Sequence, residues 1–182
     1  MLTFAQIFPE VSALYFERGS KFTMDEVAAR LCISKKTLYE MVRSKEELAV
    51  RMVDFYFEKV AALQDAIHMD ETIPAVEKLR RLLCATPDFP MRRYHLHEMK
   101  MNFPQAYQSL DGYLRQGWER TLGVLQKARS EGAIRDIDEA LFSRLYSAAI
   151  EDLLAGNEVR DEREFRLKQA EIVDMLLFGI CK

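Results

Sequence analysis

Apolar residues recur at helical spacing along almost the whole chain, with polar residues between them. The first such pattern runs from Phe4 to Tyr15 and stops before Gly19, a residue suited to the left-handed backbone that ends many helices. Pro9 lies inside this pattern, so we expect the helix to start near Pro9 or to kink there. We assign no strand anywhere in the chain, and the pattern therefore predicts an all-α fold.

Three hydroxyl side chains mark helix starts in the next stretch. Thr23 and Ser44 are each followed by a glutamate three residues later, which is the sequence signature of a capping box. Thr23 then begins a helix over about 24–31, and Ser34 begins a short helix over about 35–42. Ser44 begins a fourth helix, which is long because its apolar stripe continues for some six turns.

The remainder of the chain predicts further helices, several of them bounded by proline or glycine. The expected ranges are about 74–86, 91–103, 105–130, 138–155 and 161–180. We place a boundary near the start of the fourth helix, which gives a helix-turn-helix domain over 1–47 and a helical domain over 48–182. No flexible linker separates them, so the small N-terminal domain should be joined rigidly to the larger helical bundle.

Composition narrows the class of protein. The 182 residues carry a net charge of −3, and seven glycines and five prolines leave little material for sheet turns. Three cysteines far apart in the chain argue against a disulfide framework and fit a reducing compartment. The sequence shows neither a signal peptide nor an apolar run of about 18 residues, so we expect a cytoplasmic protein without a membrane partner.

A local excess of positive charge stands out against this mild acidity. Between residues 34 and 45 the chain has four cations and a single acidic residue, Glu40. Such a patch can attract phosphate within about 8–10 Å despite the net negative charge of the whole protein. A solvated basic face is the alternative, and the pattern around the patch decides between them.

That pattern is a helix-turn-helix arrangement. The helices over 24–31 and 35–42 would be locked together by apolar residues, namely Val27, Ala28, Leu31, Ile33 and Leu38. Lys35, Lys36, Thr37 and Tyr39 fall on the opposite side, near the start of the second helix. In helix-turn-helix proteins this end enters the major groove of DNA, where cations and hydroxyls meet phosphates and base edges.

The segment from about Ile7 to Val53 resembles the DNA-binding domain of the TetR (tetracycline-repressor-like) family of transcription regulators. The likeness is carried by "LYFERG" (14–19) and "FTMDEVAARLCISKKTLYEMVRSKEEL" (22–48). It implies that Thr23 caps its helix against a phosphate, that residues 34–39 form the recognition helix, and that residues 44–48 touch the DNA backbone. The candidate DNA-binding residues are Thr23, Ser34, Lys35, Lys36, Thr37, Tyr39, Arg43, Ser44 and Lys45.

Three features depart from that family pattern. Cys32 stands in the turn where many relatives have glycine, and a side chain there is strained if the backbone is left-handed. Met41 and Val42 replace the usual aromatic pair before the fourth helix. The N-terminus lacks the basic arm of many relatives, which suggests fewer phosphate contacts.

Aromatic and methionine residues are concentrated between residues 89 and 118. Helical core explains most of them, but apolar pockets between bundle helices also bind small ligands, and TetR-like proteins often hold an effector there. We expect a small apolar or aromatic effector, with Tyr56, Tyr94, His97, Met101, Tyr113 and Trp118 as candidate pocket residues. The two histidines at 95 and 97 fall on different helix faces, so we predict no metal site and no cofactor. No nucleophile–base arrangement or phosphate-binding glycine loop indicates an enzyme.

The last two helices each carry a wide apolar stripe. Two such helices from each of two chains can form a four-helix interface, which is how TetR-like proteins dimerise; the alternative is that they cover the core of their own chain. The candidate dimer residues are Leu141, Leu145, Ala149, Leu153, Phe165, Ile172 and Leu176.

The sequence thus predicts a homodimeric transcription regulator, a repressor acting on a near-palindromic double-stranded DNA operator. The resemblance implies that effector binding moves the fourth helix and changes the separation of the two recognition helices. The rival is a protein–protein adaptor that keeps the fold without reading DNA. It is favoured by the balance of seven Lys or Arg against seven Asp or Glu in residues 1–47.

Overall fold

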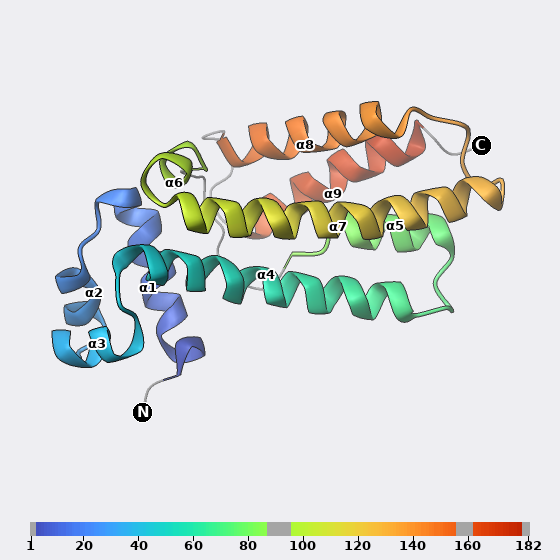
Figure 1. Ribbon diagram of the computed structural model, residues 1–182. Coiled ribbons are helices and arrows are strands. Elements are labelled where there is room, and N and C mark those ends of the chain that lie inside the picture. The colour runs from blue at the N-terminus through green and yellow to red at the C-terminus, as the bar shows by residue number, and fades with distance from the viewer. Residues whose placement is uncertain (1–2, 87–95, 156–161, 180–182) are drawn as a thin grey trace. The chain divides into compact units, whose positions relative to one another are not determined.

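The computed structural model describes residues 3–86, 96–155 and 162–179, and every regular element in these ranges is helical (Figure 1). The predicted all-α class is therefore confirmed for the described residues. The elements are α1 (Phe4–Arg18), the 3-10 helix η1 (Gly19–Lys21), α2 (Met24–Arg30), α3 (Lys35–Met41), α4 (Lys45–Met69), α5 (Ala75–Leu83), α6 (Leu96–Asn102), α7 (Pro104–Ser130), α8 (Glu139–Ala155) and α9 (Glu162–Phe178).

The chain divides into two compact units, which we call unit 1 and unit 2. Unit 1 comprises Met1–Glu58 and Arg92–Tyr113, and unit 2 comprises Lys59–Met91 and Leu114–Lys182. The long helices α4 and α7 each contribute residues to both units. The helix-turn-helix of unit 1 is thus packed in one compact unit with α6 and the first part of α7.

The helix starts in unit 1 follow the predicted hydroxyl caps. The Thr23 hydroxyl accepts the Glu26 N–H at 3.2 Å, and the Glu26 carboxylate accepts the Thr23 N–H at 2.8 Å, which completes a capping box. The Ser34 hydroxyl accepts the Thr37 N–H at 3.0 Å at the start of α3. At the start of α4, the Ser44 hydroxyl accepts the backbone N–H three residues later at 3.0 Å. Each bond satisfies an amide that the first helical turn leaves without a partner.

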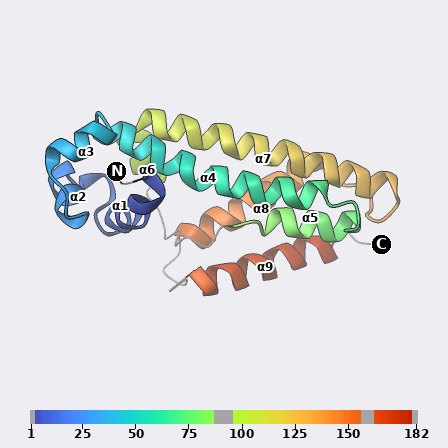
Figure 2. The ribbon, with the colours of Figure 1, turned by 90° about the horizontal axis from the view of Figure 1, so that it is seen from below.

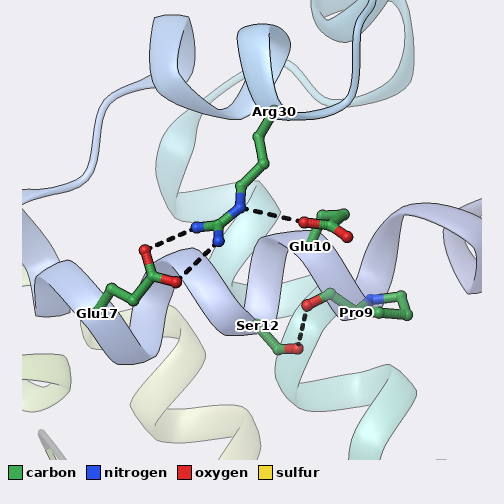
Figure 3. A network of polar contacts seen from close by, with 5 residues as sticks. All are labelled: Pro9, Glu10, Ser12, Glu17 and Arg30. Carbon is green, nitrogen blue, oxygen red and sulfur yellow. Dashed lines mark hydrogen bonds and ion pairs between the residues drawn. The ribbon is translucent and has the colours of Figure 1, made fainter.

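The first helix differs from expectation at its start. It begins at Phe4, before Pro9, because the Gln6 side chain accepts the Thr3 N–H at 2.8 Å and so closes the first turn. Pro9 lies inside the helix, and the Ser12 hydroxyl donates to its carbonyl at 3.0 Å (Figure 3). The predicted stop is confirmed, since Gly19 has a φ of 58°.

The core of unit 1 joins α1, α2, α3 and the first part of α4. Val27, Ala28 and Leu38 are buried as predicted for the residues that lock α2 to α3, while Leu31 and Ile33 are half-buried. Burial of these side chains stabilises unit 1 by about 25 cal/mol for each Å² of apolar surface that is removed from water. The other buried apolar residues here are Ile7, Phe8, Val11, Leu14, Tyr15, Phe22, Met24, Val42, Leu48, Ala49, Met52 and Val53.

An ion-pair network fastens α2 across α1 (Figure 3). The Arg30 guanidinium donates two hydrogen bonds of 2.8 Å, one to each carboxylate oxygen of Glu17, and a third of 3.1 Å to Glu10. The Glu17 hydrogen bonds raise the pKa of Arg30, and Arg30 in turn lowers the pKa of Glu17. A paired fork of this kind has a defined geometry, so it helps to fix the orientation of α2 on α1.

Unit 2 has a core of its own. Buried residues of α5, α7, α8 and α9 form one cluster that includes Leu79, Leu125, Phe142 and Val173. Helices α8 and α9 contact each other, and α5 contacts α9 (Figure 2). No helix among the described residues is long and apolar enough to cross a membrane.

Candidate nucleic-acid interface

The recognition-helix candidate, α3, has one buried face and one open face. Leu38 is 0% exposed, whereas Lys35, Lys36 and Thr37 are exposed and Tyr39 is 43% exposed. The helix is therefore anchored by its apolar side, and its polar side chains near the N-terminal end face solvent. This is the arrangement that a helix needs in order to place side chains in a DNA groove.

One of the two lysines is already paired. The Lys35 ammonium lies 2.6 Å from an oxygen of Asp25 in α2, and both side chains are more than half exposed. The Asp25 hydrogen bond and charge raise the pKa of Lys35. Exposed pairs of this kind are weak, so a phosphate can replace the carboxylate. Within the described part of the chain, Lys36 has no ion-pair partner.

The hydroxyl groups of the predicted site make local hydrogen bonds at the starts of α2 and α3. Ser34 and Thr37 bond to each other through their hydroxyl oxygens at 2.8 Å, in addition to the cap at the start of α3. Thr23 holds the capping box of α2 and also donates its hydroxyl to the Glu26 carboxylate at 3.0 Å. All three residues remain exposed, so the caps hold these oxygens at the surface in fixed positions.

The Lys45 side chain makes contacts within unit 1. Its ammonium donates to the Ser20 carbonyl at 2.6 Å and lies 4.5 Å from the ring centroid of Phe22 and 5.5 Å from that of Phe103. Burial lowers the pKa of Lys45. The charge of Lys45 thus joins α4 to η1 and to two aromatic rings, and its contact with a phosphate stays a prediction.

The neighbouring residues stay at the surface. Arg43 and Ser44 are exposed, and the Arg43 backbone N–H donates to the Glu47 carboxylate at 2.8 Å. The guanidinium of Arg43 extends from the segment between α3 and α4. Their predicted phosphate contacts stay predictions.

The turn between α2 and α3 contains a left-handed residue without being glycine. Cys32 has a φ of 53°, and its N–H donates to the Ala29 carbonyl at 3.1 Å. The next N–H, from Ile33, donates to the Ala28 carbonyl at 3.0 Å. These two bonds form a Schellman motif, whose left-handed position is usually glycine. The backbone at Cys32 is left-handed, so a side chain at this position is strained, as expected from the sequence for such a backbone. The two hydrogen bonds stabilise the turn despite this strain.

Three contacts that the sequence did not predict tie α6, α7 and the residue between them to η1, Phe22 and α4 within unit 1. The Ser20 N–H of η1 donates to Glu98 of α6 at 3.1 Å, and the Gln105 N–H of α7 donates to Glu46 of α4 at 2.8 Å. Phe103, between α6 and α7, is buried and lies 6.2 Å from the ring centroid of Phe22. No local sequence signal marks these partners, because they lie 59 to 81 residues apart.

The candidate pocket residues that the structure describes fall in both units. In unit 1, Tyr56 and Tyr113 each pack against Phe57, whereas Met101 is 68% exposed. In unit 2, Trp118 stacks with Phe142 and Tyr146 at centroid distances of 6.2 Å in both cases. Tyr94 and the side chain of His97 lie outside the described residues.

The candidate dimer residues differ in their exposure to solvent. Leu141 and Leu145 are exposed on α8, whereas Phe165 is only 5% exposed, and the predicted role of all three in a dimer stays a prediction. The remaining four, Ala149, Leu153, Ile172 and Leu176, are half-buried. Exposed apolar residues that the sequence reasoning missed are Leu167, Met175 and Phe178, all on α9. Their spacing of eight and three residues indicates one helix face, a signal that the wide apolar stripe obscures.

Comparison with known proteins shows which proteins this chain is similar to. No family model matches the chain. The chain is 29% identical, over 96% of its length and 94% of the relative's, to the uncharacterized HTH-type transcriptional regulator YvaF of Bacillus subtilis (strain 168).

Two solved structures show the fold. The TetR-family transcriptional regulator PfmR of Thermus thermophilus superposes with a TM-score of 0.68 at 19% identity, over 95% of this chain and 97% of that one. AibR in complex with isovaleryl coenzyme A and operator DNA superposes with a TM-score of 0.70 at 18% identity, over 98% and 97%. The chain therefore has the fold of the TetR-family transcriptional regulators, and the resemblance carried by its N-terminal motifs is confirmed.

Proposed function

We propose that this chain is a DNA-binding transcription regulator that reads duplex DNA with the exposed face of α3. The observation that carries the proposal is the opposition on this short helix between fully buried Leu38 and exposed Lys35, Lys36 and Thr37. Tyr39, Ser34, Thr23, Arg43 and Ser44 would position the protein on the DNA backbone. AibR, which shares the fold, was solved in complex with operator DNA, and this supports a DNA-binding role.

The regulator would act as a homodimer on a near-palindromic operator and function as a repressor. The support is the exposed apolar surface of α8 and α9, which we call the dimer face, formed by Leu141, Leu145, Leu167, Met175 and Phe178. Apolar surface of this kind on neighbouring helices is typical of a protein–protein contact. A two-fold dimer would place two copies of α3 on one side of the duplex, one helical turn of DNA or a multiple of it apart.

An effector would act through α6 and α7. The bonds from Glu98 to Ser20 and from Glu46 to Gln105 connect the starts of these helices to η1 and α4. A ligand that displaces α6 or α7 would therefore strain contacts that hold the DNA-binding helices. AibR, which shares the fold, binds isovaleryl coenzyme A, an acyl thioester with a short apolar acyl group on a large charged carrier, and this supports an effector response in general.

Selection from a random duplex library followed by anisotropy titration tests the proposal. The wild-type protein should enrich one symmetric site, and Lys35→Glu with Lys36→Glu should abolish binding while leaving helical content unchanged. The matched control, Lys127→Glu with Arg135→Glu, changes the net charge equally on exposed positions of unit 2 and should bind within about threefold of wild type. Failure to enrich any site would favour the adaptor, for which the Lys35–Asp25 pair is the supporting observation.

A further inference from the structure

A buried polar junction lies at the C-terminal end of α5 in unit 2. The Leu83 carbonyl there accepts two side-chain hydrogen bonds, from the Tyr146 hydroxyl of α8 at 2.7 Å and from the Gln169 amide nitrogen of α9 at 2.8 Å. The last carbonyls of a helix have no partner within the helix, so these two donors cap α5. The junction consequently joins three helices at one backbone oxygen.

The other half of the Gln169 amide has no partner. Its oxygen, Oε1, is buried and accepts no hydrogen bond among the described residues, although Gln169 is only 3% exposed. Leaving a buried amide oxygen without a hydrogen bond is unfavourable, because the oxygen has lost its contact with water. Buried polar groups in folded proteins nearly always have partners, so Oε1 is a candidate acceptor for a donor on a bound molecule.

The orientation of the amide is set by its surroundings. Because the nitrogen end donates to Leu83, the oxygen end is the one left open. Burial raises the pKa of Tyr146 to about 12, while the Gln169 amide beside it acts in the opposite direction. The tyrosine therefore stays protonated and keeps its donor on Leu83. The open Oε1 therefore offers an acceptor to a donor that approaches it.

An aromatic surface adjoins the junction. The ring of Tyr146 stacks on Trp118 with 19° between the planes, and Trp118 stacks in turn on Phe142. Such a surface favours a flat apolar or aromatic body. The thiol of Cys84, the residue after Leu83, is held protonated because burial raises its pKa to about 11.

We propose that Gln169 Oε1 is the hydrogen-bond acceptor of a binding site for a small aromatic or apolar molecule that carries a hydroxyl or amide N–H donor. The donor would bond to Oε1, and the apolar body would lie against the Trp118–Tyr146 stack. This proposal deepens the effector response proposed above, on which it rests, by naming the chemistry of its ligand. It assigns a role to Gln169, which the sequence pattern did not single out.

The test compares two isomers that differ in donor capacity. Benzyl alcohol has an O–H donor and anisole, of the same formula, has none. Trp118 is the single tryptophan of the chain and reports binding by its fluorescence, with N-acetyltryptophanamide correcting for quenching in solution. Wild-type protein should bind benzyl alcohol about fivefold to tenfold more tightly than anisole.

Two variants locate the preference. Gln169→Met keeps an unbranched side chain without the acceptor, and it should bind both isomers equally. Tyr146→Phe removes the other cap of Leu83 but leaves Oε1, so it should keep the preference for benzyl alcohol. If Gln169→Met does not fold, the wild-type isomer comparison alone still decides.

Equal binding of the isomers by wild type, binding of neither, or a preference that survives in Gln169→Met would each overturn the proposal. A water molecule that permanently satisfies Oε1 would produce the first result. The titration contains no DNA, so its failure would leave the proposed role of α3 intact. Loss of DNA binding would likewise leave these titrations unchanged.

Discussion

The ammonium of Lys35, at the first position of α3, lies 2.6 Å from a carboxylate oxygen of Asp25 in the first turn of α2. The pair joins the two helices of the helix-turn-helix on the surface proposed to meet DNA. A phosphate must therefore compete with Asp25 for this cation, and Asp25 also repels phosphate directly. Its removal provides a test of where DNA binds.

Asp25→Asn should raise affinity for duplex DNA by about threefold to tenfold at low salt, because it frees Lys35 and removes a negative charge from the interface. Anisotropy titration over a range of salt concentrations measures this effect. Glu119→Gln makes the same charge change on an exposed position of α7 and serves as the control. An equal gain in both variants would mean that only total charge matters and would contradict the assigned surface.

Lys45→Met and Lys36→Met should behave differently. Lys45 is bound to the Ser20 carbonyl, so its replacement should lower stability by about 1 kcal/mol without changing the salt dependence of DNA binding. Lys36→Met should leave stability unchanged and reduce the slope of log K against log salt by about 0.9. Urea unfolding and salt-dependent anisotropy provide the two measurements. A reduced slope for Lys45→Met would support its predicted phosphate contact.

Cys32→Gly should stabilise the protein by about 0.5–1 kcal/mol, because glycine accepts the left-handed backbone at φ 53° without strain from a Cβ atom. The gain is reduced by the greater freedom of glycine in the unfolded chain. Gly132 provides a matched position: it has a φ of 70° and the same pair of Schellman bonds, from Gly132 to Arg129 and from Ala133 to Ala128. Gly132→Ala should destabilise, as judged by thermal unfolding. Unchanged or lower stability of Cys32→Gly would show that the cysteine side chain makes compensating contacts.

Glu26→Gln should alter the dependence of stability on acid. The Thr23 N–H bonded to the Glu26 carboxylate lowers the pKa of Glu26 in the folded state. The ionised Glu26 carboxylate therefore adds to the stability of the folded state above the unfolded-state pKa, and this stabilisation is lost as the pH falls below about 4. Wild type should exceed Glu26→Gln in urea midpoint at pH 7, and the difference should shrink toward pH 3. A difference that stays constant over this range would exclude the carboxylate as its source.

Leu145→Glu with Met175→Glu should weaken self-association by about a hundredfold or more, because a two-fold contact would bury four uncompensated charges. Leu114→Glu changes a leucine of α7 that is exposed to a similar degree and lies outside the dimer face, so it should not affect association. Sedimentation equilibrium gives the dissociation constants. A wild-type protein that stays monomeric at micromolar concentration would refute the homodimer.

Much of this fold could be predicted because helix ends are set locally. The caps at Thr23, Ser34 and Ser44 each join atoms three residues apart, and Gly19 stops α1 through its own backbone. Such interactions depend only on neighbouring residues, so a short stretch of sequence determines them. The exposed polar face of α3 followed from the same periodicity, with Leu38 as its buried anchor.

The orientation of individual side chains could not be predicted in this way. Lys45 is turned toward Ser20, 25 residues away, and Gln169 toward Leu83, 86 residues away. Periodicity on α9 did not distinguish buried Phe165 from Phe178, which is 81% exposed. The apolar stripe of α9 is wider than the surface that packs against the rest of unit 2, so periodicity alone does not show which of its residues are buried. The sequence by itself determined where the helices begin and end and which short helix faces outward. Tertiary packing decided which cations are bound within unit 1 and which polar atom stays open in unit 2, because these depend on partners brought together only by folding.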